Sequence, residues 1–144
     1  MKSQTTLMKA LAALALAVAL SACLPNSAQA MPRGCGGCGM FGVARGQIAR
    51  INVAHIGDPN TRPIQVEMAL VDATGAVVAR DSQTIEPGQA VFFDVPFEAV
   101  GGAENRIELR PVISGGPAPH LRSTIEVYDA DTGKTTVFIG DPNI

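Results

Sequence analysis

The sequence predicts an all-β domain, and three observations point to it. Residues 31–144 hold 12 Val and 10 Ile but only 3 Leu. Branching at Cβ restricts χ1 in a helix and suits a pleated strand. Fifteen glycines and nine prolines divide the same region into short segments. No window carries an apolar stripe with the period of a helix over three clean turns, so an α-rich fold is disfavoured.

The first three strands follow from alternation and turn residues. Over Ile48–Ile56, apolar and polar residues alternate. Ile64–Leu70 is the clearest segment, because an apolar residue stands at every second position. Asp72-Ala73-Thr74-Gly75 is a turn that leads into Ala76–Ile85, and the two strands around it are expected to form a hairpin.

Four further strands are predicted in the second half of the chain. Glu86-Pro87-Gly88-Gln89 is a turn of the Pro-then-Gly kind, and Asp129–Gly133 is a second turn near the end. Each strand has β-branched or aromatic residues at alternate positions. The segments are Ala90–Val95, Arg106–Ile113, Leu121–Tyr128 and Lys134–Ile139.

Seven short strands separated by turns predict a β-sandwich of the immunoglobulin or fibronectin type III kind, with a closed barrel as the alternative. Alternation with charged residues indicates that one face of each sheet is exposed to solvent. The Cys–Trp–Cys set of true immunoglobulin domains is absent from the sequence, so only the architecture is implied. We expect the sandwich over residues 46–144, preceded by a glycine-rich flexible linker over residues 23–45.

The first residues are typical of an export signal. A segment with two lysines precedes the apolar run Ala10–Leu20, which is too short to span a hydrocarbon core of ~30 Å comfortably. Leu20-Ser21-Ala22-Cys23 resembles the lipobox of bacterial lipoproteins, which predicts a signal over residues 1–22 and a lipidated Cys23. Ala28-Gln29-Ala30 resembles an ordinary signal-peptidase site, which predicts a signal over residues 1–30.

The two cleavage sites predict different locations, both outside the cytoplasm. We favour the lipobox as the more specific match, which predicts a lipoprotein of the outer membrane or periplasm; the alternative is a freely secreted protein. Residue 24 is Leu rather than the Asp that often retains lipoproteins at the inner membrane.

Charge and hydropathy limit the classes of partner. After residue 30, nine basic residues stand against thirteen acidic ones, a net charge of −4, and the basic residues form no cluster. No nucleic-acid partner is therefore expected. A polytopic membrane protein is excluded, and membrane contact is expected only through the lipid on Cys23.

Two cysteines remain after either cleavage. Cys35 and Cys38 are expected to form a local disulfide or to stay as two idle thiols outside the cytoplasm. No helix or βαβ unit follows them as a thioredoxin-like site needs, and residue 39 is Gly rather than the His of a haem motif. Zinc would need two more ligands, which only His55 and His120 could supply. No metal and no cofactor is therefore predicted.

Two short motifs are best explained by turns. Asp129, Asp131 and Gly133 faintly resemble a calcium loop, but the glycine comes too early and position twelve is Gly140. A hairpin turn in which the aspartates accept backbone hydrogen bonds explains them better. Ile-Gly-Asp-Pro-Asn occurs twice, starting at Ile56 and Ile139, and each copy is expected to end a strand in a turn.

Catalytic residues are not predicted. Ser82, Ser114 and Ser123 are candidate nucleophiles, but no GxSxG elbow surrounds them. Paired carboxylates of a glycosidase usually act beside exposed aromatic residues, and the chain has no Trp and one Tyr, Tyr128.

Four stretches resemble a group of small exported bacterial proteins of unknown function. They are Gly46–Val53, Leu70–Gly75, Glu86–Ala90 and Ile125–Val137. The resemblance covers most of residues 46–139 and implies an exported all-β domain with no assigned catalytic residues.

The sequence thus predicts a non-enzymatic exported protein, a lipid-anchored module that binds an envelope or surface protein or has a structural role. One alternative is a periplasmic thiol- or metal-handling protein that uses Cys35 and Cys38. Another is a subunit of an extracellular assembly or a homo-oligomer, joined through an unpaired edge strand.

Overall fold

The computed structural model describes residues 39–140, so the predicted export signal, Cys23, Cys35 and Cys38 lie outside the described residues. The described chain consists of eight strands, one short helix and one 3₁₀ turn. In chain order they are β1 Phe41–Ala44, β2 Gln47–His55, β3 Ile64–Asp72, β4 Val77–Ile85, β5 Ala90–Pro96, α2 Phe97–Val100, β6 Arg106–Ser114, η2 Ala118–His120, β7 Leu121–Asp129 and β8 Thr135–Ile139.

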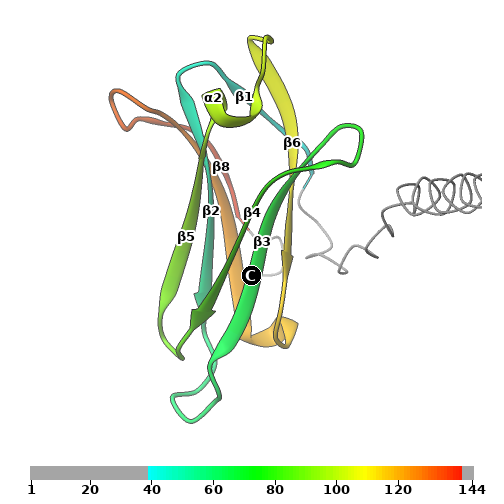
Figure 1. The fold of residues 1–144 in the computed structure, drawn as a ribbon. Coiled ribbons are helices and arrows are strands. Elements are labelled where there is room, and N and C mark those ends of the chain that lie inside the picture. The colour runs from blue at the N-terminus through cyan, green and yellow to red at the C-terminus, as the bar shows by residue number, and fades with distance from the viewer. Residues whose placement is uncertain (1–38, 141–144) are drawn as a thin grey trace, which may run out of the picture. The chain divides into compact units, whose positions relative to one another are not determined.

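These strands form two four-stranded antiparallel sheets, which confirms the predicted all-β sandwich. One sheet has the order β1-β6-β3-β4 and the other β5-β2-β7-β8. What the fold shares with immunoglobulin and fibronectin type III domains is this packing of two antiparallel sheets. Figure 1 shows the β2–β3 loop and the β6–β7 connection together at one end, with α2 at the opposite end.

The seven predicted strands correspond to β2–β8, and each predicted end lies within two residues of the observed one. Strand β1 was not predicted. It lies inside the segment expected to be a linker, residues 23–45, and pairs with Arg106–Leu109 of β6. Four residues among glycines are too few to show alternation, but Phe41 and Val43 are buried. The sandwich therefore begins at Phe41 rather than at Gly46.

The core lies between the two sheets and is built from the inward residues of each strand. The predicted inward faces of β2, β3 and β7 are confirmed, because their alternate apolar residues are buried. Phe97 of α2 is buried with them at one end of the sandwich. The largest contributors are Ile51, Met68, Leu70, Ile85, Phe97, Leu109 and Ile125.

The expectation of one wet face per sheet does not hold along the whole of β3. Ala69 and Val71 point to the other face of that strand, yet both are buried, together with Val112 of β6. The register explains their proximity, since Ala69 pairs with Val112. This part of β3 is consequently apolar on both faces.

Aspartates shape the two turns that the sequence singled out. The Asp129 carboxylate accepts the backbone N–H and the hydroxyl of Thr132, both at 2.7 Å. Asp72 does the same with Thr74, at 2.8 and 2.6 Å, and also accepts the N–H of Ala76. The hydrogen bond from Thr132 holds the pKa of Asp129 below its usual value, and that from Thr74 does so for Asp72.

The Asp129 turn predicts an acid-dependent stability. Because the pKa of Asp129 is lower in the folded than in the unfolded chain, the carboxylate stabilises the fold above its unfolded pKa of about 3.9, and this contribution is lost as the pH falls through the folded pKa. Asp129→Asn keeps an acceptor oxygen but removes the charge. The deficit in the free energy of unfolding, measured in urea at several pH values, should be largest near neutral pH and should shrink toward about pH 3.

Asp131→Asn is the control for this prediction. It removes a charge from the same turn, but the Asp131 side chain accepts no hydrogen bond within the described residues. A deficit for Asp129→Asn that is independent of pH, or equal to that of Asp131→Asn at every pH, would contradict the proposed role of the carboxylate.

Candidate functional site

The outer face of the β5-β2-β7-β8 sheet carries an arginine held by a carboxylate. Arg50 of β2 pairs in register with Asp94 of β5. Its Nε donates to Asp94 Oδ1 and its Nη2 to Oδ2, both at 2.7 Å. Two parallel hydrogen bonds of this kind fix the orientation of the guanidinium plane as well as its position.

Two aromatic rings enclose the same guanidinium. The Arg50 Cζ atom lies 4.4 Å from the ring centroid of Phe92 and 5.1 Å from that of Tyr128, within the range of cation–π attraction. Nη2 of Arg50 also donates to the Tyr128 hydroxyl, which donates to Asp94, each at 3.3 Å. We call Arg50, Phe92, Asp94 and Tyr128 the Arg50 cluster.

Electrostatics within the Arg50 cluster follow from this geometry. The hydrogen bond from Arg50 to Asp94 raises the pKa of the guanidinium further, so the arginine stays charged. Partial burial raises the pKa of Tyr128, and the neighbouring Asp94 charge adds to the effect. The tyrosine therefore stays a neutral hydroxyl that can both donate and accept.

Exposed aromatic rings extend this face. Phe92 is 57% exposed and Phe138 of β8 is 64% exposed. With Tyr128 they place three of the chain's six aromatic residues on one side of one sheet. Aromatic residues and arginine are enriched in protein interfaces and among the residues that dominate binding energy. Sequence reasoning missed this set, although the neighbours Phe92 and Phe93 on one strand already required one ring to face outward.

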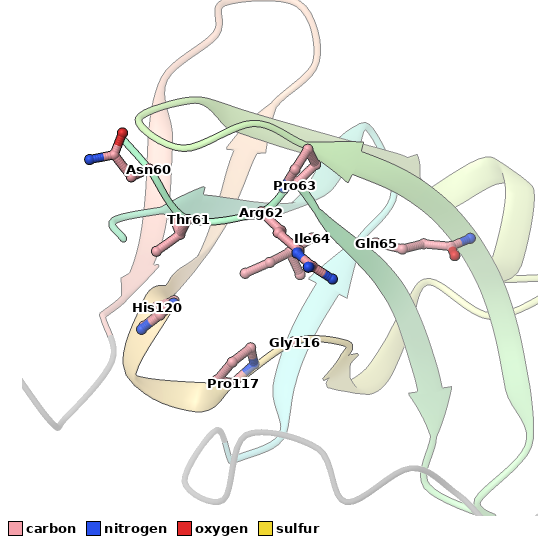
Figure 2. Close-up of a pocket in the computed structure, with 9 residues that line it drawn as sticks. All are labelled: Asn60, Thr61, Arg62, Pro63, Ile64, Gln65, Gly116, Pro117 and His120. Atoms are coloured by element: carbon pink, nitrogen blue, oxygen red, sulfur yellow. The ribbon is translucent and has the colours of Figure 1, made fainter. Parts of the chain in front are cut away.

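A pocket of about 620 Å³ lies at the end of the sandwich where the β2–β3 loop meets the β6–β7 connection. Figure 2 shows it between these two segments. It is lined by Asn60, Thr61, Arg62, Pro63, Ile64, Gln65, Gly116, Pro117 and His120.

The structure brings together two histidines that are far apart in the sequence. The ring centroids of His55 and His120 lie 6.1 Å apart, because β2 pairs His55 with Leu121, the residue after His120. His120 lines the pocket, whereas His55 is 1% exposed. These are the residues that a Cys₂His₂ zinc site would have needed, and its other two members, Cys35 and Cys38, lie outside the described residues.

The hydrogen bonding of His55 bears on whether it can hold a metal. Its Nδ1 accepts the N–H of Gly57 at 3.2 Å, so the proton of the neutral ring is on Nε2. Nε2 has no hydrogen-bond partner among the described residues. A metal ligand needs a free lone pair, and in this tautomer His55 offers a proton instead. Within residues 39–140 no group of three or more His, Cys, Asp or Glu residues could hold a metal ion.

The three candidate serines lie on different strands. Ser82 is on β4, Ser114 on β6 and Ser123 on β7. Ser123 is buried, and the Ser82 hydroxyl accepts a hydrogen bond from Gln65. In the described part of the chain no hydrogen bond joins any of these hydroxyls to a histidine, which is the contact that a Ser–His nucleophile requires.

The two Ile-Gly-Asp-Pro-Asn copies have different surroundings. The first follows β2 and makes a turn in which the Asp58 carbonyl accepts the N–H of Thr61 at 2.8 Å. In the second, Ile139 is the last residue of β8, and residues 141–143 lie outside the described residues. A Cβ at Gly57 would lie 2.7 Å from His55 Cε1, whereas one at Gly140 would have no heavy atom closer than 4.0 Å.

Comparison of the chain with protein-family models, with curated proteins and with solved structures finds no match in any of the three. Within residues 39–140, no helix is long and apolar enough to cross a membrane.

Gly57 and Gly140 hold the same place in the two Ile-Gly-Asp-Pro-Asn copies, but replacing each by Ala is expected to have opposite effects on stability. Gly57→Ala should reduce the free energy of unfolding by about 1–3 kcal/mol, because the new methyl group overlaps the buried His55 ring and the Thr61 hydroxyl. Gly140→Ala should be neutral or stabilise by up to about 1 kcal/mol, because it only restricts the unfolded chain. Urea unfolding of both variants measures the difference, and equal effects would show that Gly57 is not tightly enclosed.

Proposed function

We propose that this chain is a non-enzymatic, exported β-sandwich protein that binds a protein partner in the cell envelope and is tethered there by lipid at Cys23. The partner docks on the outer face of the β5-β2-β7-β8 sheet. The observation that carries the proposal is the Arg50 cluster, whose Phe92 ring is exposed, with the exposed ring of Phe138 beside it.

The chemistry of this face favours a protein over a small anion. Asp94 already binds Nε and Nη2 of Arg50, and the rings of Phe92 and Tyr128 lie over the guanidinium. The arginine therefore holds the two rings in place more than it offers its own fork to an anion. The rings of Phe92 and Phe138 remain available for apolar contact. Burying one such side chain contributes about 1.5–3 kcal/mol, and two together are enough to act as the centre of an interface.

Mutual pairing of the polar groups supports a binding role rather than a catalytic one. Arg50, Asp94 and Tyr128 hydrogen-bond to one another, and Asn52 donates to the Thr124 hydroxyl at 3.2 Å. A partner that covers this face can therefore leave these pairs intact, and breaking one so that a buried donor or acceptor is unpaired would cost about 1–3 kcal/mol for each group.

Site-specific photo-crosslinking in the producing bacterium tests the proposed face. A photoreactive phenylalanine analogue placed at Phe138 should give one discrete protein adduct, because that ring is exposed beside the Arg50 cluster. The same analogue at Val77 of β4, an exposed apolar residue of the other sheet, is the matched control and should give none. The products are separated by mass and the adduct is identified by mass spectrometry.

A second substitution tests the role of the exposed Phe92 ring. Phe92→Ala in the crosslinking protein should reduce the adduct yield several-fold while changing the free energy of unfolding by less than about 1 kcal/mol, since Phe92 is exposed. Equal adducts from positions 138 and 77, or none from position 138, would contradict the proposed face.

Intact mass of the protein extracted from membranes tests the anchor. Cleavage before Cys23 with added acyl chains is expected, whereas an unmodified chain that begins at Met31 would indicate free secretion. The same spectrum reports the redox state of Cys35 and Cys38, whose disulfide lowers the mass by two hydrogens. Two free thiols with a bound metal would favour the thiol- or metal-handling alternative instead.

A further inference from the structure

The pocket at the β2–β3 end of the sandwich is separate from the outer face of the β5-β2-β7-β8 sheet, which carries the Arg50 cluster. Its volume of about 620 Å³ lies within the range of small-ligand sites. Figure 2 shows the Arg62 side chain extending across the middle of the lining, with Ile64 behind it and with His120 and Pro117 on the other wall. The side chain of Gln65 points away from this centre.

The lining carries one positive charge and no negative one. Arg62 is among the nine lining residues, but no Asp or Glu is. Arg62 makes no hydrogen bond or ion pair with any residue within 39–140. Asp58, the nearest acidic residue along the loop, is not part of the lining. In a chain with more acidic than basic residues, an unpaired guanidinium at a pocket favours a singly charged anion.

The walls of the pocket are held by close backbone packing. The N–H of Ile56 donates to the His120 carbonyl at 2.8 Å, which ties the two loops together. Gly116 has φ of +55°, and a Cβ there would lie 2.5 Å from the Ile64 side chain. A Cβ at Gly115 would lie 2.0 Å from the Gln65 carbonyl oxygen. A site assembled before the ligand arrives loses less conformational entropy on binding.

We propose that this pocket binds a carboxylate attached to a short apolar group. The planar fork of Arg62 matches the two oxygens of a carboxylate, and one cation balances one negative charge. His120 offers a ring nitrogen from the other wall, and Ile64 and Pro117 provide apolar contact. A free aliphatic acid and the C-terminus of a peptide share this chemistry.

Titration of the ¹⁵N-labelled exported protein distinguishes a free aliphatic acid from a peptide C-terminus as the ligand. The ligands tested are sodium hexanoate, N-acetyl-alanyl-valine with a free C-terminus, and the same dipeptide with an amidated C-terminus. A carboxylate should saturably shift the amide signals of the non-proline residues in 60–65 and 116–120, and the amidated peptide should not. Tighter binding of hexanoate identifies a free acid as the ligand, and tighter binding of the free dipeptide identifies a peptide terminus.

Two arginine variants complete the test. Arg62→Gln should weaken carboxylate binding by roughly tenfold or more, because a hydrogen bond between charged groups is lost. Arg80→Gln, at an exposed arginine of β4 outside the pocket, should bind as the wild type does. The spectrum of Arg62→Gln away from the pocket shows that it is folded. The proposal is overturned if neither acid shifts these signals, if the amidated peptide binds as tightly as the acid, or if Arg62→Gln binds unchanged.

Discussion

The two-residue alternation of strand β2 is the constraint on which both candidate sites depend. β2 pairs with β5 on one side and with β7 on the other along nearly its whole length. Its inward residues, such as Ile51, are in the core, and the same pleat turns Arg50 to the outer face. The strand ends at His55, beside the pocket. A slip of one residue would exchange the two faces, so burial of the core holds both sites in place.

Two arginines of the same chain have different roles because their partners differ. Arg50 lies between two rings and is held by a carboxylate, so it contributes shape and apolar contact to a surface. An ion pair that is partly exposed adds little stability by itself, and its main effect here is to fix where the rings and the guanidinium lie. Arg62 has no acidic neighbour in the pocket lining, so its charge is available to a ligand.

Most of the fold followed from local patterns, and most of the candidate sites did not. Seven strands were predicted because alternation and turn residues are local signals, and the Asp129 turn has the hydrogen bonds that its side chain was expected to make. Strand β1 was missed because it is too short to show alternation and is recognised only by its pairing with β6. The Arg50 cluster joins β2, β5 and β7, and Arg50 is 44 positions from Asp94 and 78 from Tyr128 in the sequence. No local spacing pattern predicts a contact between residues so far apart.

The sequence by itself determined the fold class, the position of each longer strand and the residues of the turns. Those features depend on side-chain period, on branching at Cβ and on a few residues that favour turns. Only the tertiary structure decided which strands are neighbours and in which register, and so placed His120 beside His55 and Tyr128 beside Arg50. The physical reason is that every strand offers the same backbone donors and acceptors along its edges. Alternation therefore tells which face of a strand is buried, while the choice of neighbour depends on how all the strands pack together.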